Sequence, residues 1–330
     1  MQTLTQYEYL DRDMILKGVA DWIVKESPLT GALTMKPVQG NSLKYNVTLT
    51  LPTASWLTVG DQISESTGTY EQRSTDIYTL IQNAYTDKAA IALNATQDPE
   101  AIDAALAAQA MAHEFEKTLI IGQTSVDTTT KQFKGLLRVV AELESASTTD
   151  LDAINNDQII AGTDSTGALT MAAMDELIDQ IKPGKPDMLL MSRRMRRKLN
   201  TLSRATQSSG LELADAALFG IKMMHYDEVP IYVSDWILDN YIEGSSSVQA
   251  ISTYDFDAAA VAGTNENSVI FAMQIGEDKC TGLHAGEMKH EREEIVEDYN
   301  AILNRYIWYC GFAAFKKYSL ACMTGVNPRD

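Results

Sequence analysis

The longest regular pattern of apolar residues runs from residue 98 to residue 122, DPEAIDAALAAQAMAHEFEKTLIIG. Asp98 can cap a helix, Pro99 fits its first position, and Gly122 can supply a left-handed stop. Glu100 is favoured by the positive end of the helix. The pattern predicts a helix of about 36 Å. Its shallow apolar band is typical of a strut rather than of a bundle helix, and consists of Ile102, Leu106, Ala110, Met111, His113, Phe115 and Leu119.

A strict alternation of apolar and polar residues marks residues 43–51, LKYNVTLTL, and predicts a half-buried strand. The polar stretch that follows has Trp56 and Ile63 as its apolar points, and a second strand is expected around residues 76–85. Together these segments predict an extended hairpin. Because its middle has too few apolar residues for a core of its own, it is either flexible or lies on another surface.

Residues 1–40 are predicted to form an arm. Asp11 or Asp13 can open a short helix that Ser27-Pro28 ends. A single amphipathic helix cannot bury its own apolar stripe, so this stripe needs either the main body of the chain or another subunit. Both alternatives stay open for the stripe residues Ile15, Val19, Trp22 and Ile23.

From residue 170 the pattern changes to alternating helices and strands, after a polar stretch at 144–157 that is a plausible boundary between lobes. One amphipathic helix carries Met174, Leu177, Ile178 and Ile181 and ends at Lys182-Pro183-Gly184. After a buried strand at 187–191, Ser192 caps a second helix with Met195, Leu199 and Leu202 on its inner face. We expect a long surface loop at 203–220, and then strands at 221–226, 229–233, 248–253 and 268–273.

The last fifth of the chain is predicted to be extended. Residues 286–300 are heavily charged, whereas 301–322 are apolar and rich in aromatic residues. Gly311 is expected to bend this path. Both faces of the strand are apolar: Tyr306, Trp308, Cys310 and Phe312 on one side, Ile307 and Tyr309 on the other.

Composition limits the function classes. At 330 residues and 45% hydrophobic, the chain can bury a large core in two or more lobes. No apolar run approaches the roughly 20 residues of a membrane span, and residues 1–13 lack a signal region, so assembly in a cytosol is expected. The formal net charge of −18 repels nucleic acid unless a local patch overrides it. Cys280, Cys310 and Cys322 are odd in number and widely spaced, which favours buried free thiols.

A basic run is the one feature typical of a nucleic-acid patch, and comprises Arg193, Arg194, Arg196, Arg197 and Lys198. It lies on a helix whose inner face is already assigned, and no aromatic residues interleave with it. We therefore favour a solvated or subunit-facing surface, with phosphate contact as the open alternative.

No catalytic residue, cofactor site or metal site is predicted. The residues His284, Glu287, His290, Glu291, Glu293 and Glu294 match no HExxH or facial-triad spacing. His113-Glu114 lacks a second histidine four residues on, and no Ser/His/Asp arrangement is evident. An enzyme is therefore disfavoured.

The order of these elements resembles the major capsid protein of tailed bacteriophages, with the Hong-Kong-97-like (HK97-like) fold. The resemblance covers nearly the whole chain, and rests on motif order more than on any one motif. The matching segments are SPLTGAL at 27–33, Leu51-Pro52-x-Ala54-x-Trp56-x-x-x-Gly60-Asp61, Leu119-Ile120-Ile121-Gly122, Phe133-Lys134-Gly135-Leu136, MSRRMRRKL at 191–199, FGIKMMHYDEVPIYVSD at 219–235 and IWYCGFAAFKKYSLACMTGV at 307–326.

The resemblance implies an α+β capsid fold in four parts. These are an N-terminal arm at 1–40, an extended β-hairpin (E-loop) at 41–86, a peripheral domain at 87–150 and 286–310 with a spine helix at 98–122, and an α/β axial domain at 151–285 and 311–330. The hairpin would lie across a neighbouring subunit, and the arm would clasp another. Candidate intersubunit contacts are Trp22, Trp56, Gly60, Asp61, Arg73, Arg193, Arg194 and Arg197.

The function that the resemblance implies is self-assembly, as hexamers and pentamers, into the icosahedral head shell around a double-stranded DNA genome. Assembly would take place in the host cytoplasm, and the mature protein would reside in the virion. Expected partners are other copies of the chain, a portal, a possible decoration protein and DNA bound without sequence specificity, with no membrane. The arm is short for a built-in scaffold, so a separate scaffolding protein is expected.

One chemical feature of the family and two alternative functions remain to be considered. Arg73 is the only basic residue between Lys44 and Lys88, so the lysine–asparagine crosslink of some family members lacks its nucleophile. The alternative function is an encapsulin, a related shell around cargo enzymes, although encapsulins tend to be shorter and to lack so long an arm. A soluble hydrolase is a third and more distant class.

Overall fold

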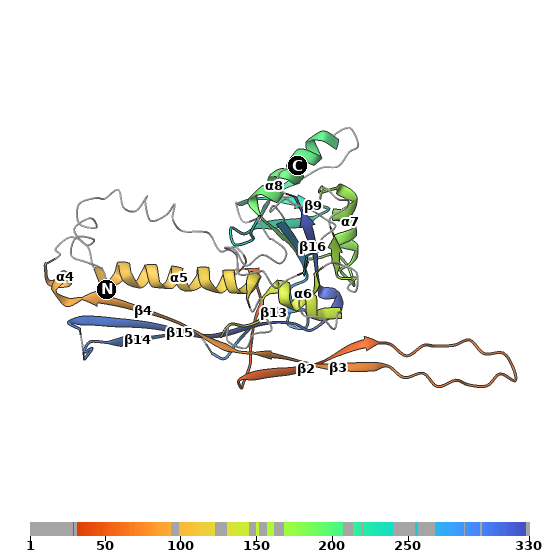
Figure 1. The fold of residues 1–330 in the computed structure, drawn as a ribbon, viewed down its shortest axis with the longest axis horizontal. Coiled ribbons are helices and arrows are strands. Elements are labelled where there is room, and N and C mark those ends of the chain that lie inside the picture. The colour runs from red at the N-terminus through yellow and green to blue at the C-terminus, as the bar shows by residue number, and fades with distance from the viewer. Residues whose placement is uncertain are drawn as a thin grey trace.

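The computed structural model describes most of the chain after residue 28. The described residues are 29, 32–93, 99–122, 131–144, 150–151, 157–161, 168–206, 214–218, 221–239, 255–256, 268–286, 288–297 and 299–327. Helices and strands carry the labels of Figure 1.

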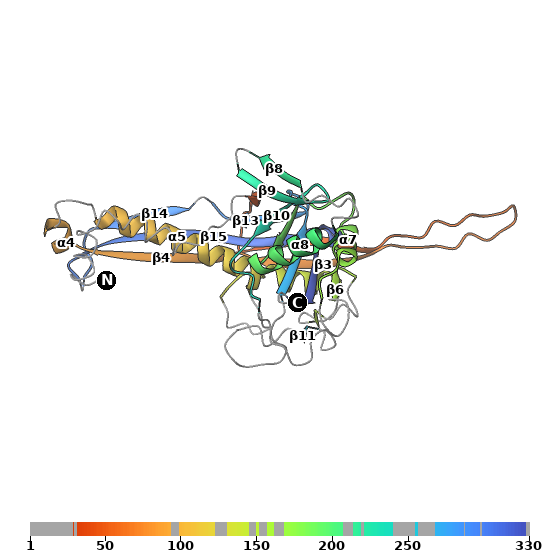
Figure 2. The same cartoon turned by 90° about the horizontal axis from the view of Figure 1, so that it is seen from above.

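Three parts are visible in Figure 1: a flat layer, a lobe that rises above one end of it, and a thin hairpin. In the flat layer, α5 lies along β4, β15 and β14. The lobe carries α7 and α8, and the hairpin is formed by β2 and β3. Figure 2 shows that the flat layer and the hairpin extend in opposite directions from the region of the lobe.

The flat layer is a five-stranded sheet with one long helix along it. Its elements are β1 (Met35–Pro37), β4 (Tyr78–Asp87), α4 (Lys88–Leu93), α5 (Pro99–Ile121), β13 (Cys280–His284), β14 (Lys289–Glu293) and β15 (Ala301–Ala314). β15 is the central strand, antiparallel to β4 on one side and to β13 and β14 on the other. β1 adds to β13 in parallel.

The lobe is built on a seven-stranded mixed sheet with the order β6-β16-β12-β7-β10-β9-β8. The strands are β6 (Ile159–Ala161), β7 (Met188–Met191), β8 (Ala214–Leu218), β9 (Ile221–Tyr226), β10 (Val229–Val233), β12 (Ser268–Met273) and β16 (Leu320–Val326). The helices are α6 (Leu136–Glu144), α7 (Met171–Asp179) and α8 (Arg193–Thr206), with a short 3-10 helix at Lys317–Ser319. β5 (Asp150–Leu151) and β11 (Asp255–Phe256) form a separate parallel pair.

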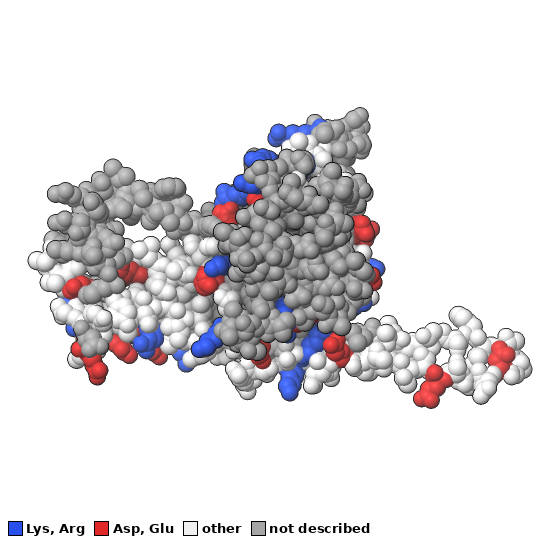
Figure 3. All heavy atoms as spheres, in the orientation of Figure 1, with Lys and Arg blue, Asp and Glu red and all other residues white. Residues whose placement is uncertain are grey.

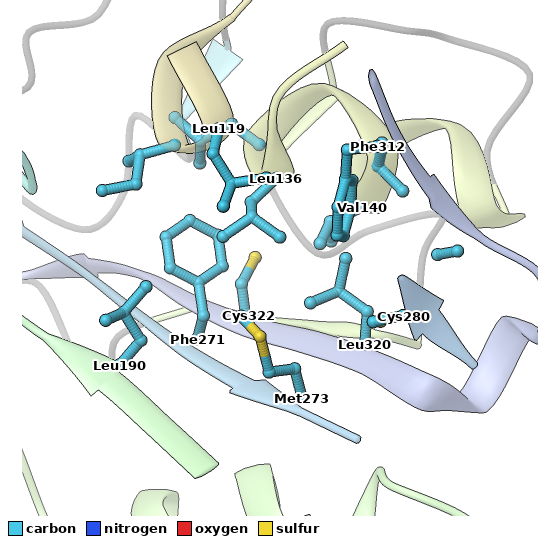
Figure 4. Packing of buried hydrophobic residues seen from close by; sticks show 14 of the residues in the cluster. Leu119, Leu136, Val140, Leu190, Phe271, Met273, Cys280, Phe312, Leu320 and Cys322 are labelled. Carbon is cyan, nitrogen blue, oxygen red and sulfur yellow. The ribbon is translucent and has the colours of Figure 1, made fainter. Parts of the chain in front are cut away.

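The strands β7, β12 and β16 of the lobe sheet are buried on both faces, which explains why they are almost continuously apolar. Leu190 and Phe271 lie in a core shared with α5, α6 and β15 (Figure 4). Their neighbours Leu189 and Ile270 lie in a second core with residues of α7 and α8. This alternation follows from the two-residue period of a strand. The first core therefore joins the lobe to the flat layer.

The predicted long helix is confirmed as α5, although its buried side differs from the expected band. Met111, Phe115 and Leu119 are buried, whereas Leu106 is 42% exposed. The buried side also contains the carboxylate of Glu116. The proposed cap Asp98 lies outside the described residues.

Two predictions about glycine are wrong. Gly122 does not have the positive φ of a left-handed stop. Its amide donates a helical hydrogen bond to the Thr118 carbonyl. A Cβ at Gly122 would stand only 2.5 Å from the Phe133 carbonyl oxygen. Gly311 does not bend β15, which stays in unbroken register with β13 on both sides of it. A Cβ at Gly311 would approach the Asp76 carbonyl oxygen to 3.2 Å. Close approach of backbones, rather than turning, explains both glycines.

The predicted hairpin exists, but its return strand differs from the prediction. β2 (Ser42–Thr50) pairs with β3 (Thr69–Asp76), inside the stretch expected to be a polar excursion. The strand expected around 76–85 is β4, and its partner is β15. β3, TYEQRSTD, lacks an apolar alternation because both of its faces are largely exposed. Its Thr and Tyr residues still favour extended backbone.

In the lobe, the strands predicted at 221–226, 229–233 and 268–273 are confirmed as β9, β10 and β12. The loop predicted at 203–220 is wrong in two places, because α8 continues to Thr206 and residues 214–218 form β8 against β9. The strand predicted at 248–253 lies outside the described residues.

Candidate intersubunit surfaces

The hairpin exposes a series of large apolar side chains. Trp56 and Val59 are fully exposed, and Ile63 is 79% exposed. Leu51 and Leu57 extend this series, and Tyr70 adds an exposed ring on β3. Beyond Thr50 and before Thr69, the two segments of the hairpin run side by side without forming a strand pair. No sheet or helix lies above or below them (Figures 1 and 2). An isolated two-stranded hairpin is at best marginally stable in water. Because these side chains stay exposed, they contribute no burial free energy to the fold of their own chain.

The end of the hairpin is a defined turn. The Thr58 amide donates to the Asp61 carboxylate at 2.7 Å, and the Asp61 amide donates to the Thr58 carbonyl at 3.0 Å. Gly60, with φ of +101°, takes a conformation that favours glycine. Gly60 and Asp61 therefore shape the turn, and Asp61 already uses one carboxylate oxygen within its own chain. Their contact with a neighbouring subunit stays a prediction.

The root of the hairpin is anchored to the body. Arg73 donates to the Leu143 carbonyl at the end of α6 at 2.7 Å, and pairs with Glu71 at 3.0 Å. The Tyr45 ring meets Phe315 edge-on, with ring centroids 5.0 Å apart. Burial raises the pKa of the Tyr45 hydroxyl. The two described partners of Arg73 are thus in its own chain, and an intersubunit role for it stays a prediction.

The basic run lies at the start of α8. Ser192 caps this helix by accepting from the Met195 amide at 3.2 Å, as predicted. Arg193 makes a two-pronged pair with Asp235 at 2.5 and 3.0 Å, and the Arg194 guanidinium lies 3.4 Å from Asp239. Arg197 is exposed, and no carboxylate of the described residues lies within 4 Å of its guanidinium. Within the part of the chain that the structure describes, the run is therefore neutralised at Arg193 and Arg194 but not at Arg197.

An acidic residue at the start of α5 joins this helix to the sheet. Glu100 accepts from Arg292 at 2.6 and 3.2 Å and from the Asn304 amide at 3.0 Å. The Arg292 hydrogen bonds hold the pKa of Glu100 below its usual value. The sequence indicated only the favourable helix end for this residue, since its partners lie about two hundred positions away.

The three cysteines and the histidine–glutamate stretch were the residues to check for reactive groups. Cys280, Cys310 and Cys322 are free and buried, as predicted, and burial raises the pKa of Cys280 and of Cys310 to about 12. Among these residues, no group of three or more His, Cys, Asp or Glu could hold a metal ion. His290 instead contacts the Asn304 side chain at 2.9 Å. No described helix is both long and apolar enough to span a membrane.

Of the eight predicted contact residues, Trp22 lies outside the described residues. The other seven form three separate groups: Trp56, Gly60 and Asp61 at the far end of the hairpin, Arg73 at its root, and Arg193, Arg194 and Arg197 on α8. Sequence reasoning missed the exposed Leu57, Val59 and Tyr70. Their signal was available, because apolar residues in a segment without helical or strand period have no core to enter.

Solved structures show where this architecture recurs. An encapsulin complex from Synechococcus elongatus is 16% identical, with a TM-score of 0.65 over 97% of both chains. The capsid of a native GTA particle is 12% identical, with a TM-score of 0.62 over 96% of this chain and 99% of that one. Mycobacterium phage Adephagia gives 13% identity and a TM-score of 0.57 over 99% and 98%. These likenesses confirm the HK97-like fold.

Sequence comparisons identify the family more narrowly than the shared fold does. No curated protein sequence matches the chain. A family model, however, matches residues 19–236 of the 330, which is more than half of the chain, and it describes the SU10 major capsid protein. The chain therefore belongs to the SU10 major capsid protein family, and its function is to form a capsid shell.

Proposed function

We propose that this chain self-assembles as hexamers and pentamers into the icosahedral head shell of a tailed phage, around its double-stranded DNA genome. The observation that carries the proposal is the hairpin, whose apolar side chains have no cover in their own chain. In a closed shell every copy has a neighbouring copy in the same relative position, so that neighbour can cover these side chains. The hairpin would lie across that neighbour.

The energetics favour many repeated contacts over one strong contact. Full burial of a large apolar side chain contributes about 1.5–3 kcal/mol. Trp56, Val59 and Ile63 are each exposed enough to gain on this scale. A gain of that size per copy is modest, but in a closed assembly each copy both gives and receives the contact. Shell stability then rises with protein concentration.

The division of labour follows the three parts of the molecule. The flat layer with α5 would act as the peripheral domain, and the lobe as the axial domain that gathers around fivefold and sixfold axes. Because Arg73 and Tyr45 fix the root of the hairpin, the direction in which it leaves the body is set before assembly. The segment before residue 29 would clasp a further subunit through Trp22.

The charge supports enclosure of DNA without tight binding. A net charge of −18 opposes association with a polyanion, so a packaged genome could move along the shell wall. Assembly in the host cytoplasm with a separate scaffolding protein, a portal and a decoration protein completes the proposal. Purification of assembly intermediates with their bound proteins would identify these partners.

The central experiment removes the far end of the hairpin. Thr53 and Ser66 already face each other, with the Thr53 amide 2.8 Å from the Ser66 hydroxyl. Residues 54–65 can therefore be replaced by a two-residue Asn-Gly turn without disturbing β2 and β3. We expect a folded, unassembled protein by circular dichroism and light scattering. Closed particles of normal size from this variant would refute the intersubunit role of the hairpin.

A second candidate function is an encapsulin-type shell around cargo enzymes. It is favoured by the TM-score of 0.65 to an encapsulin over 97% of both chains. The two functions differ in contents, since a phage head holds DNA and an encapsulin holds protein cargo. Nuclease-protected DNA of genomic length in purified particles would support the phage head, whereas a packaged enzyme without DNA would support the encapsulin.

A further inference from the structure

The two helices on the outer face of the lobe sheet carry opposite charges. α7 buries Met174 and Leu177, and α8 buries Met195 and Leu199, in the same core. Both helices therefore cover one face of the sheet, and their other sides face away from it. α7 contains acidic residues and no basic ones, whereas α8 contains basic residues and no acidic ones.

The basic side of α8 is a straight line of arginines. Arg193, Arg197 and Arg204 are spaced by four and seven residues, which places them on the side opposite the buried Met195. The line is about 16 Å long. Arg193 is held by Asp235, but no carboxylate of the described residues lies within 4 Å of the guanidinium groups of Arg197 and Arg204. This surface is exposed and electropositive in a strongly acidic chain.

The acidic side of α7 is shorter than the arginine line, since Asp175 and Asp179 lie about 6 Å apart along the helix axis. Asp175, Glu176 and Asp179 are all exposed. Asp175 accepts a hydrogen bond from the Tyr226 hydroxyl at 2.5 Å. Among the described residues, no cation lies within 4 Å of Glu176 or Asp179. The spacing of four residues places Asp175 and Asp179 on one side of α7, just as it places Arg193 and Arg197 on one side of α8.

The two charged surfaces lie on different edges of the lobe. In Figure 3, blue atoms gather along the upper left edge of the lobe, over α8, and red atoms lie on its right edge, at α7. A patch that contacts a different patch on the next copy makes a heterologous contact, and such contacts form a ring when the rotation between copies closes. One copy cannot satisfy both edges by itself, but a ring of copies can.

We propose that the arginine line of α8 in one copy docks on the acidic side of α7 in the next copy of the same ring. The proposal rests on the proposed shell function and names the partner surface of the basic run. Subunits with a charge of −18 repel one another, and local contacts of opposite sign would offset part of this repulsion and fix the register of the ring. Duplex DNA is the competing partner for α8, and the experiment below separates the two.

The test uses two charge-reversal variants of the full chain. The first, Arg197→Glu with Arg204→Glu, makes both edges acidic, and the second, Glu176→Lys with Asp179→Lys, makes both basic. We expect each variant alone to need at least about tenfold more protein for assembly than the wild type at low salt. Arg197→Lys with Arg204→Lys keeps the charge and is the matched control, which should assemble as the wild type does.

Mixing the two variants gives the decisive result. In an equimolar mixture every α8 can meet an α7 of opposite charge if the variants alternate around the ring. Alternation requires an even number of subunits, so we expect sixfold rings to return in electron micrographs and fivefold rings to stay absent. All four substitutions in one chain should restore both. Either rescue also shows that the variants fold.

Three outcomes would overturn the proposal. Normal assembly of both single-edge variants, or no rescue on mixing or recombining them, would reject the α7–α8 contact while leaving the shell function intact. Unchanged assembly together with loss of salt-sensitive duplex DNA binding in the arginine variant would assign α8 to DNA. If the wild type itself formed no rings or shells, the proposed function would fail and this contact with it.

Discussion

The hairpin and the lobe sheet are both made of strands, yet they treat apolar side chains in opposite ways. All four residues of β7 are buried, with successive side chains in two different cores. The hairpin points Trp56 and Val59 entirely into solvent. The comparison teaches that apolar residues in an extended segment indicate burial, but do not indicate whether the covering surface belongs to the same chain or to another copy. The lobe finds its cover within the chain, and we propose that the hairpin finds its cover on another copy.

Phe271→Ala tests the lobe side of the comparison and should have the largest effect. Phe271 is fully buried between the lobe sheet and the flat layer. Loss of its ring leaves a cavity and should lower the free energy of unfolding by about 3–5 kcal/mol. Urea unfolding of the unassembled protein measures this. An effect below that of an exposed substitution would mean that the core is not packed as described.

Arg73→Ala tests the junction between the two regions. The substitution leaves the Leu143 carbonyl without its donor and should cost about 1–3 kcal/mol. Hydrogen exchange should become faster in β2 and β3 and stay unchanged in β7. Arg73→Lys, which keeps a cation but not the planar donor fork, should lie between the two. Equal exchange in all three proteins would contradict an anchored root.

Trp56→Ala tests the hairpin side. Since this side chain is fully exposed, the free energy of unfolding of the unassembled chain should change by less than about 0.5 kcal/mol. Shell formation should nevertheless weaken, as measured by light scattering against protein concentration. Thr48→Ala, at an exposed polar position of β2, is the control. A Trp56 variant that is destabilised but assembles normally would mean that Trp56 supports the fold of its own chain rather than the contact between copies.

Glu100→Gln tests a contact inside the flat layer and should have the smallest effect. Arg292 lowers the pKa of Glu100, so this carboxylate adds stability above its unfolded-state pKa. That contribution is lost as the pH falls through the lower folded-state pKa. Solvent screening keeps it small because Arg292 is 40% exposed. Below about pH 4.5 the wild type should lose slightly more stability than the variant. Identical acid unfolding curves would contradict this.

Local patterns were sufficient to predict much of this fold. The helix cap at Ser192, the strand bounds of β9, β10 and β12, and the buried thiols all depend on nearby residues or on composition. Strand pairing was less accessible. β4 was expected to return along β2, but it pairs with β15 more than two hundred positions away. Neither strand carries a local sign of its partner.

The candidate surfaces were predictable only where a residue lacked an intrachain partner. Trp56 was correctly identified as apolar and uncovered, because nothing in its neighbourhood could bury it. Arg73 and Asp61 are predicted intersubunit contacts too, yet both have partners in their own chain. Long polar side chains find such partners through tertiary contacts. The charge opposition of α7 and α8 likewise became visible only when both were placed on one face of the lobe sheet.

The central strand β15 also has a mechanical consequence. It pairs with β4 at ten successive positions and continues without a break into its ladder with β13. A tension directed along this strand would shear all ten pairs at once, rather than peel them apart one by one. The flat layer is thus built to resist stretching along its length. A wall made of such layers would carry an outward pressure as in-plane load, spread over many backbone hydrogen bonds.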